Sequence, residues 1–218
     1  MRITNNTILI TGGSDGIGLA LAKRFLLLKN KVIITGEEFG KLEGIKKDFP
    51  ELIVLAGDLT EQNSINELVL FIEQEYPETN ILINSAAVQY NYDVMDEPDF
   101  LRKADHEISL NLIVPLKLTA LLLPTLLKNK NSAIVNVSSD EFIIPQKSAA
   151  VYCATKAGIR SFTKSLKYQL ADTQVKVFEI IPALINTPMT AERGKSLIEP
   201  DNLVDKFITD FYNDRNDQ

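Results

Sequence analysis

The sequence predicts an α/β protein with a doubly wound parallel sheet and helices on both faces. Short runs rich in valine, isoleucine and leucine alternate regularly with longer helical patterns. The short runs are apolar almost throughout, as in strands buried on both faces, rather than at every second residue. No repeat, low-complexity tract or linker interrupts the alternation, so residues 1–218 are expected to form a single domain.

Six strands are expected, one at each run of β-branched and leucine residues. The runs are 7–10, 32–35, 52–55, 81–83, 133–137 and 175–181. Branched side chains pack well on a pleated surface that helices cover, which is why these runs predict strands rather than short helices.

Helices are expected in the longer stretches between these runs. The stretches are 17–29, 41–49, 64–76, 99–128 and 152–170, and a further helical pattern covers 200–212. The second helix should end before Pro50, because the proline ring disfavours helical geometry in the residue before it. Ser64 and Glu67 have the spacing of a capping box and predict the start of the third helix.

The composition is that of an ordinary globular protein, and it excludes several classes of partner. Hydrophobic residues make up 45% of the chain and charged residues 24%, with a formal net charge of −6. Because the chain is acidic and has no basic run, neither nucleic acid nor an anionic membrane surface is an expected partner. The apolar stretch 110–127 carries Asn111, Lys117 and two prolines, which argues against a membrane span.

Cysteine usage and the N-terminal residues indicate a cytoplasmic location. Cys153 is the only cysteine, which excludes an internal disulfide. No cysteine–histidine cluster has the spacing of a metal site, so no metal is expected. The first six residues are polar and the next apolar run is short, unlike a signal peptide.

A glycine-rich turn joins the first strand to the first helix. It reads TGGSDGIG at 11–18, in the place where a parallel α/β sheet binds dinucleotides. Glycines let the backbone approach a pyrophosphate, and the following helix offers free amides and the positive end of its dipole. Many glycine-rich turns are only tight loops, but three glycines at this spacing and place favour cofactor binding. The expected contacts are Gly12, Ser14, Asp15, Gly16, Ile17 and Gly18.

Acidic residues after the second strand and in the glycine turn predict that NAD(H) is preferred over NADP(H). Glu37 stands where a ribose-reading carboxylate is expected, and Asp15 adds negative charge nearby. Carboxylates accept hydrogen bonds from a 2′-hydroxyl and repel a 2′-phosphate. In the alternative, Glu37 and Glu38 cap the next segment or face solvent, and the two interpretations have nearly equal weight. Asp58, followed by Leu59, either receives the adenine amine or caps the next helix.

Catalytic chemistry is expected in the stretch 139–156. Tyr152 and Lys156 stand four residues apart, so in a helix their side chains share one face. A phenol titrates near pH 10, and a neighbouring ammonium stabilises the phenolate and lowers that pKa. Ser139 ends an apolar run and brings a hydroxyl to the same point, so the three groups are expected to share one substrate oxygen. The alternative to a catalytic role is an ordinary helix in which Lys156 is exposed to solvent, and the surrounding motif residues disfavour it.

Taken together, these motifs resemble the short-chain dehydrogenase/reductase family. The resemblance covers residues 7–189, and the combination of motifs in this order is highly specific. The motifs are TGGSDGIG at 11–18, GDL at 57–59, NSAA at 84–87, Asn111, Ser139, YCATK at 152–156 and IIPALINTPM at 180–189. The opening residues are also similar to a bacterial subgroup encoded alongside teichoic-acid D-alanylation genes.

The resemblance implies a fold and a reaction. The fold would be a Rossmann-type sheet in the strand order 3-2-1-4-5-6, and the reaction a hydride transfer between NAD(P) and an alcohol or carbonyl carbon. Tyr152 would be the acid/base, Ser139 would hold the substrate oxygen, and Lys156 would also bind the nicotinamide ribose. Asn111 would interrupt its helix and hold a water that passes protons to Lys156.

The resemblance also implies further cofactor contacts. Asn84 and Ala86 would line the cofactor cleft, and Pro182 and Thr187 would lie beside the nicotinamide carboxamide. A substrate lid would cover about 186–200, and the substrate would be a small alcohol or carbonyl compound whose identity the sequence does not reveal.

The sequence departs from the family pattern in three places. Ala87 replaces a permissive glycine, and Pro182 is followed by alanine rather than glycine. No seventh strand is visible after Met189. These departures support a second hypothesis, a non-catalytic NAD(P)-binding sensor or scaffold. The complete set of Asn111, Ser139, Tyr152 and Lys156 favours the enzyme.

The remaining polar residues have plainer interpretations. His106, the only histidine, is expected to face solvent, as is the acidic helix face at Asp99 and 105–107. Tyr90 and Tyr92 either form a wall of a substrate pocket or cover apolar surface. The segment 112–127 is apolar on nearly every face, so this helix and the one at 152–170 are expected to pack against their copies in a homodimer or homotetramer.

Overall fold

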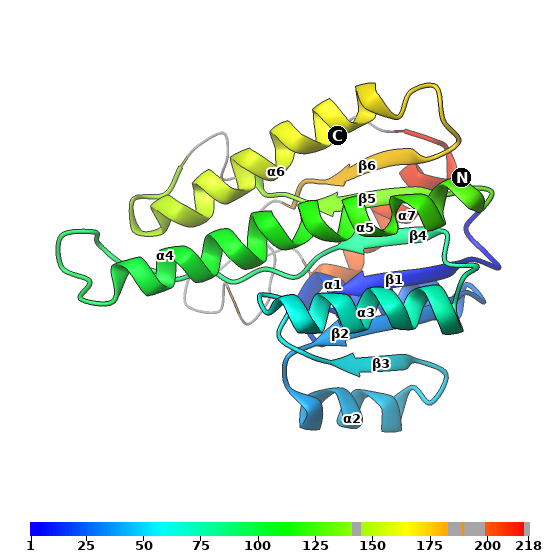
Figure 1. Cartoon of the computed structure of the whole chain (residues 1–218), viewed down its shortest axis with the longest axis horizontal. Helices are drawn as coiled ribbons and strands as arrows, with labels where there is room; N and C mark the ends of the chain where they lie inside the picture. Colours follow the sequence, from blue (N-terminus) through cyan, green and yellow to red (C-terminus); the bar gives the residue numbers. More distant parts are fainter. Residues whose placement is uncertain (141–144, 183–188, 190–198, 216–218) are drawn as a thin grey trace.

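Six parallel strands form one sheet in the order β3-β2-β1-β4-β5-β6 (Figure 1). The computed structural model describes residues 1–140, 145–182, 189 and 199–215. The strands are β1 (Thr7–Thr11), β2 (Lys31–Gly36), β3 (Ile53–Ala56), β4 (Ile81–Asn84), β5 (Ala133–Val137) and β6 (Lys176–Ile180). The predicted fold class and strand order are therefore confirmed, and within the described residues the sheet ends at β6.

Helices connect the strands and cover both faces of the sheet (Figure 1). The α-helices are α1 (Gly16–Leu27), α2 (Phe39–Asp48), α3 (Gln62–Glu75), α4 (Phe100–Ile108), α5 (Val114–Lys128), α6 (Ala150–Gln169) and α7 (Pro200–Tyr212). A π-helical segment, η1 (Ser109–Ile113), joins α4 to α5, and a short 3₁₀ turn, η3 (Lys147–Ala149), precedes α6.

The strands are continuously apolar because successive side chains enter two different hydrophobic clusters. Ile8 and Ile10 of β1 pack into the cluster that contains α1, α2 and α7. Leu9, between them, packs into the cluster that contains α3, α5 and α6. Side chains alternate between the faces of a strand, so a sheet covered on both faces needs apolar residues at every position.

Helix α7 closes the first of these clusters over the region between α1 and β6. Phe211 is fully buried, and its ring lies 6.2 Å from the ring centre of Phe25 and 4.7 Å from that of Phe178. The predicted bounds of this helix, 200–212, agree with the structure. The predicted lid at 186–200 lies mostly outside the described residues.

The predicted start of α3 was wrong. Ser64 and Glu67 do not form a capping box, because the helix begins at Gln62 without a side-chain cap. The chain turns earlier, where Asp58 Oδ1 accepts hydrogen bonds from the backbone N–H of Thr60 at 2.8 Å and from its hydroxyl at 2.7 Å. This turn leads directly into the helix.

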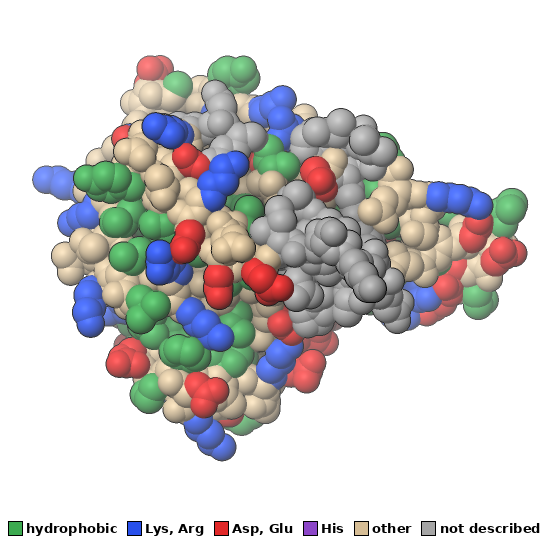
Figure 2. Space-filling view, turned by 180° about the vertical axis from the view of Figure 1, so that it is seen from behind, with side chains coloured by type: hydrophobic (Ala, Val, Ile, Leu, Met, Phe, Trp, Pro, Cys, Tyr) green, Lys and Arg blue, Asp and Glu red, His purple; other side chains and the backbone are tan. Residues whose placement is uncertain are grey.

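The helical stretch Phe100–Lys128 is long and apolar enough to cross a membrane by length and composition alone. In its most apolar window 44% of the residues are buried within the protein, and the core helix of a globular protein meets the same criteria. Helix α4 and the segment before it project beyond the strand ends (Figure 1). The space-filling view shows a lobe at its right edge where acidic, basic and hydrophobic side chains lie together (Figure 2). Exposed Val94 and Met95 lie in that projecting segment among acidic residues.

Candidate active site

The turn between β1 and α1 forms a cradle that requires glycine. Gly12 and Gly16 have positive φ angles of +66° and +49°. A Cβ on Gly12 would lie 2.6 Å from Cα of Ala86, and one on Gly18 would lie 2.2 Å from the carbonyl oxygen of Gly12. A side chain at Gly12 or Gly18 would therefore collide with the neighbouring backbone. The N-terminal amides of α1 lie at the edge of the cleft.

Thr11 ties the end of β1 to the segment that follows β4. Its hydroxyl oxygen accepts hydrogen bonds from the backbone N–H groups of Ser85 at 3.1 Å and Ala86 at 3.2 Å. β1 and β4 are neighbours in the sheet although the chain visits β2 and β3 between them. The cleft thus lies at the carboxyl ends of the strands where the strand order reverses, the usual ligand site of such sheets.

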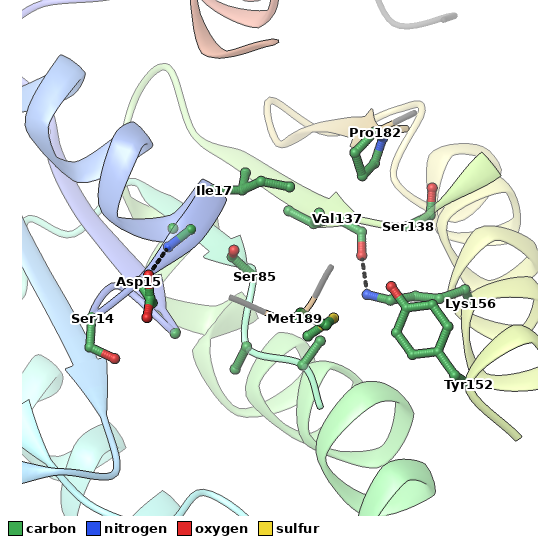
Figure 3. A pocket seen from close by; sticks show the side chains of 15 residues that line it. Ser14, Asp15, Ile17, Ser85, Val137, Ser138, Tyr152, Lys156, Pro182 and Met189 are labelled. Carbon is green, nitrogen blue, oxygen red and sulfur yellow. Dashed lines mark hydrogen bonds between the residues drawn. The ribbon is translucent and has the colours of Figure 1, made fainter. Parts of the chain in front are cut away.

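A cavity of about 300 Å³ opens at this edge of the sheet (Figure 3). All six contacts predicted in the glycine turn line it, and so do four of the other predicted residues. Its lining comprises Gly12, Ser14, Asp15, Gly16, Ile17, Gly18, Ser85, Ala86, Ala87, Val137, Ser138, Tyr152, Lys156, Pro182 and Met189.

Tyr152 and Lys156 lie in the first turns of α6 and both reach this cavity. Their side chains come from one helix and lie together (Figure 3), with Lys156 Nζ 5.5 Å from the centre of the Tyr152 ring. The Lys156 ammonium also donates a hydrogen bond of 2.9 Å to the carbonyl oxygen of Val137 at the end of β5. Both residues are buried, so a cation is held beside a phenol in a site largely screened from water.

Asn111 lies inside the π-helical segment η1, where the predicted interruption of the long helix occurs. Its amide accepts a hydrogen bond from the backbone N–H of Val88 and donates one to the Val88 carbonyl, both at 2.8 Å. It also donates to the Thr155 hydroxyl at 3.3 Å, and Thr155 donates to the Tyr152 carbonyl at 2.7 Å. Asn111 therefore joins the segment after β4 to the helix that carries Tyr152 and Lys156.

Two adjacent serines follow β5 and differ in their surroundings. Ser138 lines the cavity, but its hydroxyl donates to Glu179 Oε1 at 2.6 Å and points away from Tyr152 (Figure 3). Ser139, the predicted substrate-binding residue, is buried and is not among the residues that line the cavity.

One further predicted cofactor contact within the described residues, Asn84, does not line the cleft. The Asn84 side chain is buried and donates to Asn136 Oδ1 at 2.8 Å, while Asn136 donates to the Thr163 hydroxyl at 2.8 Å. Asn84 therefore connects β4, β5 and α6 below the cleft. Thr187 lies outside the described residues.

A second cavity, of about 120 Å³, adjoins the first and shares Gly12, Ser14, Ala86 and Ala87 with it. Besides the shared Gly12, Ser14 and Ala86, three further predicted cofactor contacts line this cavity: Glu37, Asp58 and Leu59. Asp58 does not cap α3, because this helix begins at Gln62 without a side-chain cap; one carboxylate oxygen of Asp58 accepts from Thr60 in the turn before the helix.

The charge of Asp15 is partly offset, which the sequence did not indicate. One carboxylate oxygen accepts a hydrogen bond from Gly16 N–H at 2.7 Å, and the other forms an ion pair with Lys41 of α2. Both side chains of the pair are about two-fifths exposed. The repulsion that Asp15 would exert on a 2′-phosphate is therefore weaker than the sequence suggested. The predicted preference for NAD(H) over NADP(H) thus depends mainly on Glu37.

His106 and Glu107 lie in surroundings that the sequence analysis did not predict. His106 was predicted to face solvent, but it is half-buried, lines the second cavity, and shares a 2.7 Å hydrogen bond with the Tyr90 hydroxyl. Glu107 was predicted to be solvated, but it is fully buried. Its carboxylate accepts hydrogen bonds from Tyr90 N–H at 2.9 Å and from the Tyr92 hydroxyl at 2.8 Å.

The burial of Glu107 has a clear electrostatic consequence. Desolvation raises the pKa of its carboxyl above the ordinary value, although the hydrogen bonds from Tyr90 and Tyr92 oppose this. Burial and the hydrogen bond to Glu107 also raise the pKa of the Tyr92 phenol. Tyr92 thus anchors the loop through a buried contact, and its ring packs edge-on against Phe100. This packing agrees with a tyrosine that covers apolar surface, and Tyr92 lines neither of the two cavities.

Ala87, which stands where the family usually has glycine, does not adopt a left-handed backbone conformation. Among the described residues, positive φ angles at non-glycine positions occur only at Asn5, Lys29, Asn131 and Asp214. Ala87 lines both cavities without a left-handed conformation, so the alanine is accommodated there without strain.

The residues of the cleft fit a dinucleotide. A glycine cradle at a helix N-terminus suits a pyrophosphate, and a cavity extends from it in each direction. The larger cavity holds the phenol and the ammonium, and the smaller holds carboxylates and apolar residues. This is the arrangement that a nicotinamide half and an adenosine half would require.

The chain belongs to the short-chain dehydrogenase family, whose model, described as short chain dehydrogenase, matches residues 6–197. It is 41% identical to the protein named "Uncharacterized oxidoreductase DltE" of Bacillus subtilis over 187 residues, which is 86% of this chain and 74% of that protein. This relative supports the predicted likeness to the subgroup associated with D-alanylation genes. The chain is also 31% identical to an uncharacterized oxidoreductase of Staphylococcus epidermidis over 214 residues, 95% of this chain and 91% of that protein.

Solved structures share the fold at lower sequence identity. A short chain dehydrogenase/reductase from Burkholderia phymatum in complex with NAD superposes with a TM-score of 0.89 at 18% identity, covering 99% of this chain and 88% of that chain. A short chain dehydrogenase from Burkholderia cenocepacia in complex with NADP gives a TM-score of 0.86 at 22% identity, covering 97% and 86%.

Proposed function

We propose that the protein is a nicotinamide-dependent oxidoreductase that interconverts an alcohol and a carbonyl compound, with Tyr152 as its acid/base. The observation that carries this proposal is the buried pair of Tyr152 and Lys156 in the cavity that also contains the glycine cradle. The membership of an oxidoreductase family supports it.

Each side chain of the proposed site has a separate role in the transfer of the hydride and the proton. The nicotinamide supplies or accepts the hydride when it is bound. In the direction of reduction, Tyr152 donates its proton to the substrate oxygen, and in oxidation the phenolate removes that proton. Lys156 stabilises the phenolate by its charge. The family resemblance assigns the hydrogen bond to the substrate oxygen to Ser139, which directly follows Ser138 of the cavity wall. Asn111 holds the segment after β4 and a water that returns the proton by way of Lys156.

Substitution of Tyr152 by phenylalanine tests the proposal directly. Tyr152→Phe removes the hydroxyl and keeps the ring, so turnover should fall by at least a hundredfold, within the range of general acid–base contributions. The dissociation constant for NADH should stay within about threefold, because the ring still packs beside Lys156. Fluorescence titration with NADH and a panel of alcohols and ketones provide the two measurements.

Two results would contradict the enzymatic account in different ways. Unchanged turnover in Tyr152→Phe would remove Tyr152 from the chemistry. NADH binding to the unaltered protein without turnover of any compound in the panel would favour the non-catalytic sensor or scaffold instead.

We also propose that NAD(H) is preferred over NADP(H), with Glu37 as the discriminating residue. Glu37 lines the second cavity, where its carboxylate would repel a 2′-phosphate. Glu37→Gln should therefore tighten NADPH binding relative to NADH by about tenfold, while Glu38→Gln should leave the ratio unchanged because Glu38 does not line that cavity. Parallel titrations with NADH and NADPH measure the ratio, and equal effects of the two variants would contradict the assignment.

We also propose an oligomeric state and a cellular location for the protein. Apolar side chains on η1 and α5, among them Ile113, Leu121 and Leu127, are more than one-third exposed in the single chain. We expect a homodimer or homotetramer that covers them, in the cytoplasm, where the single buried Cys153 stays reduced.

A further inference from the structure

Thr35 is a buried hydroxyl residue for which the described part of the chain provides no hydrogen-bond partner. It is the penultimate residue of β2 and is 2% exposed. Its backbone carbonyl accepts from Gly13 N–H at 2.9 Å, but its side-chain oxygen neither donates to nor accepts from any described residue. A buried polar group without a partner is unfavourable, and a valine of the same shape would avoid the penalty. The presence of a hydroxyl here therefore requires an explanation.

The position of Thr35 supplies one. It lines the 120 Å³ cavity, and it also lines a neighbouring hollow of about 40 Å³ between β3 and α3. Glu37, the residue that follows the end of β2, lines the same 120 Å³ cavity. Thr35 thus borders the part of the cleft that holds Glu37, Asp58 and Leu59 rather than the part that holds Tyr152.

The surroundings of Thr35 suit a flat heteroaromatic ring. Leu59, Ala86 and Leu110 give the cavity apolar walls, and Asp58 and His106 are its polar members on the side of β3 and α4. Apolar walls with a few polar groups that fix orientation are typical of small-molecule sites. An adenine ring offers nitrogen acceptors and one amine donor along its edge, and a threonine hydroxyl can donate to the first or accept from the second.

We propose that the Thr35 hydroxyl hydrogen-bonds the adenine of the bound nucleotide and so contributes to cofactor affinity. The inference rests on the proposed function only in taking the second cavity as the adenosine half of the cleft. It adds a residue on β2 to the adenosine contacts expected from the sequence, which were confined to Glu37, Asp58 and Leu59.

The competing explanation is a purely structural one. Ser64 and Glu67 border the small hollow, and a water there could satisfy Thr35 without any ligand. In that case the hydroxyl contributes to the protein alone, and its removal has no effect on nucleotide binding.

Thr35→Val separates the two explanations because valine has the same shape and lacks the hydroxyl. The matched control is Thr35→Ser, which keeps the hydroxyl and removes only a methyl group. The probes are NADH, AMP, which carries only the adenosine end, and reduced nicotinamide mononucleotide, which lacks that end. Thr35→Val should weaken NADH and AMP about fivefold to tenfold, the range of one net hydrogen bond, and leave the mononucleotide unchanged. Thr35→Ser should stay within about twofold for all three.

Each outcome of these titrations decides the inference. Equal AMP affinity of Thr35→Val and the unaltered protein would overturn it, as would an equal loss for the mononucleotide, which would indicate general distortion of the cleft. A failure of the proposed enzyme function would appear separately, as absence of turnover, and the AMP titration would still decide the role of Thr35.

Discussion

At Gly12 the backbone of the glycine turn passes so close to Ala86 that one methyl group decides whether the cleft can form. We expect Gly12→Ala to lower the free energy of unfolding by about 1–3 kcal/mol, because its φ of +66° is strained for alanine and the new Cβ would lie 2.6 Å from Cα of Ala86. NADH binding should be lost as the turn moves. Urea unfolding and fluorescence titration measure the two effects.

Gly44 provides the matched control for this prediction. It lies within α2, and a Cβ added there would meet no atom within 4 Å. Gly44→Ala should therefore raise the free energy of unfolding by about 0.5–1 kcal/mol and leave NADH binding unchanged. If both variants bound NADH equally well, the cradle would not be the site of the cofactor.

Single residues were predictable from the sequence where chemistry fixes their spacing. The glycines of the turn, Tyr152 and Lys156 were identified because a pyrophosphate and a shared helix face each demand one pattern. His106 and Glu107 were missed because their surroundings are created by the loop that precedes α4. No periodicity within the helix reveals that such a loop folds back over its polar face.

At the scale of elements, Glu107 is one of the residues that hold the segment after β4, through hydrogen bonds from Tyr90 N–H and the Tyr92 hydroxyl. The same segment is tied to Asn111 at Val88, and Tyr92 N–H donates to the Ser148 carbonyl at 2.9 Å, just before α6 begins. One buried carboxylate on α4 thus helps to connect the lining of the cleft with the start of the helix that carries Tyr152.

We predict that Glu107→Ala loosens this connection while Glu107→Gln preserves it. Alanine leaves Tyr90 N–H and the Tyr92 hydroxyl without a buried acceptor, so the free energy of unfolding should fall by about 2–4 kcal/mol. Glutamine offers both an acceptor and a donor of similar shape. Hydrogen exchange should show faster exchange at residues 88–92 in the alanine variant alone, and equal exchange in both variants would contradict the anchoring role.

The raised pKa of Glu107 gives this pair of variants a second readout. A group whose pKa is higher in the folded state stabilises the fold at low pH, and that contribution is lost as the pH rises through the folded-state pKa. Glutamine does not ionise. The unfolding free energy of the unaltered protein relative to Glu107→Gln should therefore decrease as the pH rises above 4.5, the ordinary value for glutamate. A constant difference across this range would indicate that Glu107 is not desolvated.

Strands and helices were predictable to within a few residues, but their ends were less so. The bounds of α7 agree, whereas α3 begins at Gln62 because the turn formed by Asp58 and Thr60 starts the helix earlier than Ser64. The interruption at Asn111 was expected, but its π-helical form and the hydrogen bonds of Asn111 with Val88 and Thr155 were not, because both partners lie far away in the sequence.

For the whole molecule, the alternation of apolar runs and helical patterns was sufficient to predict a parallel sheet covered on both faces. The order of its strands came from the family resemblance, because periodicity does not say which strands pair. The division of the cleft into two cavities, and the Lys41 partner of Asp15, depend on side-chain positions that only the folded chain reveals.

Exposed side chains on α5 and α6 predict that the protein forms an oligomer through these two helices. Leu121 of α5 is 40% exposed and Tyr168 of α6 is 83% exposed, on the two helices expected to meet their copies. Light scattering at micromolar concentration should give the mass of a dimer or tetramer, and Leu121→Glu should shift it towards the monomer because a charge would then be buried against the partner. Leu70 of α3, 52% exposed, is the control, and Leu70→Glu should leave the mass unchanged. A monomeric mass for the unaltered protein would exclude the oligomer. Dissociation by Leu70→Glu but not by Leu121→Glu would place the contact surface on α3 instead.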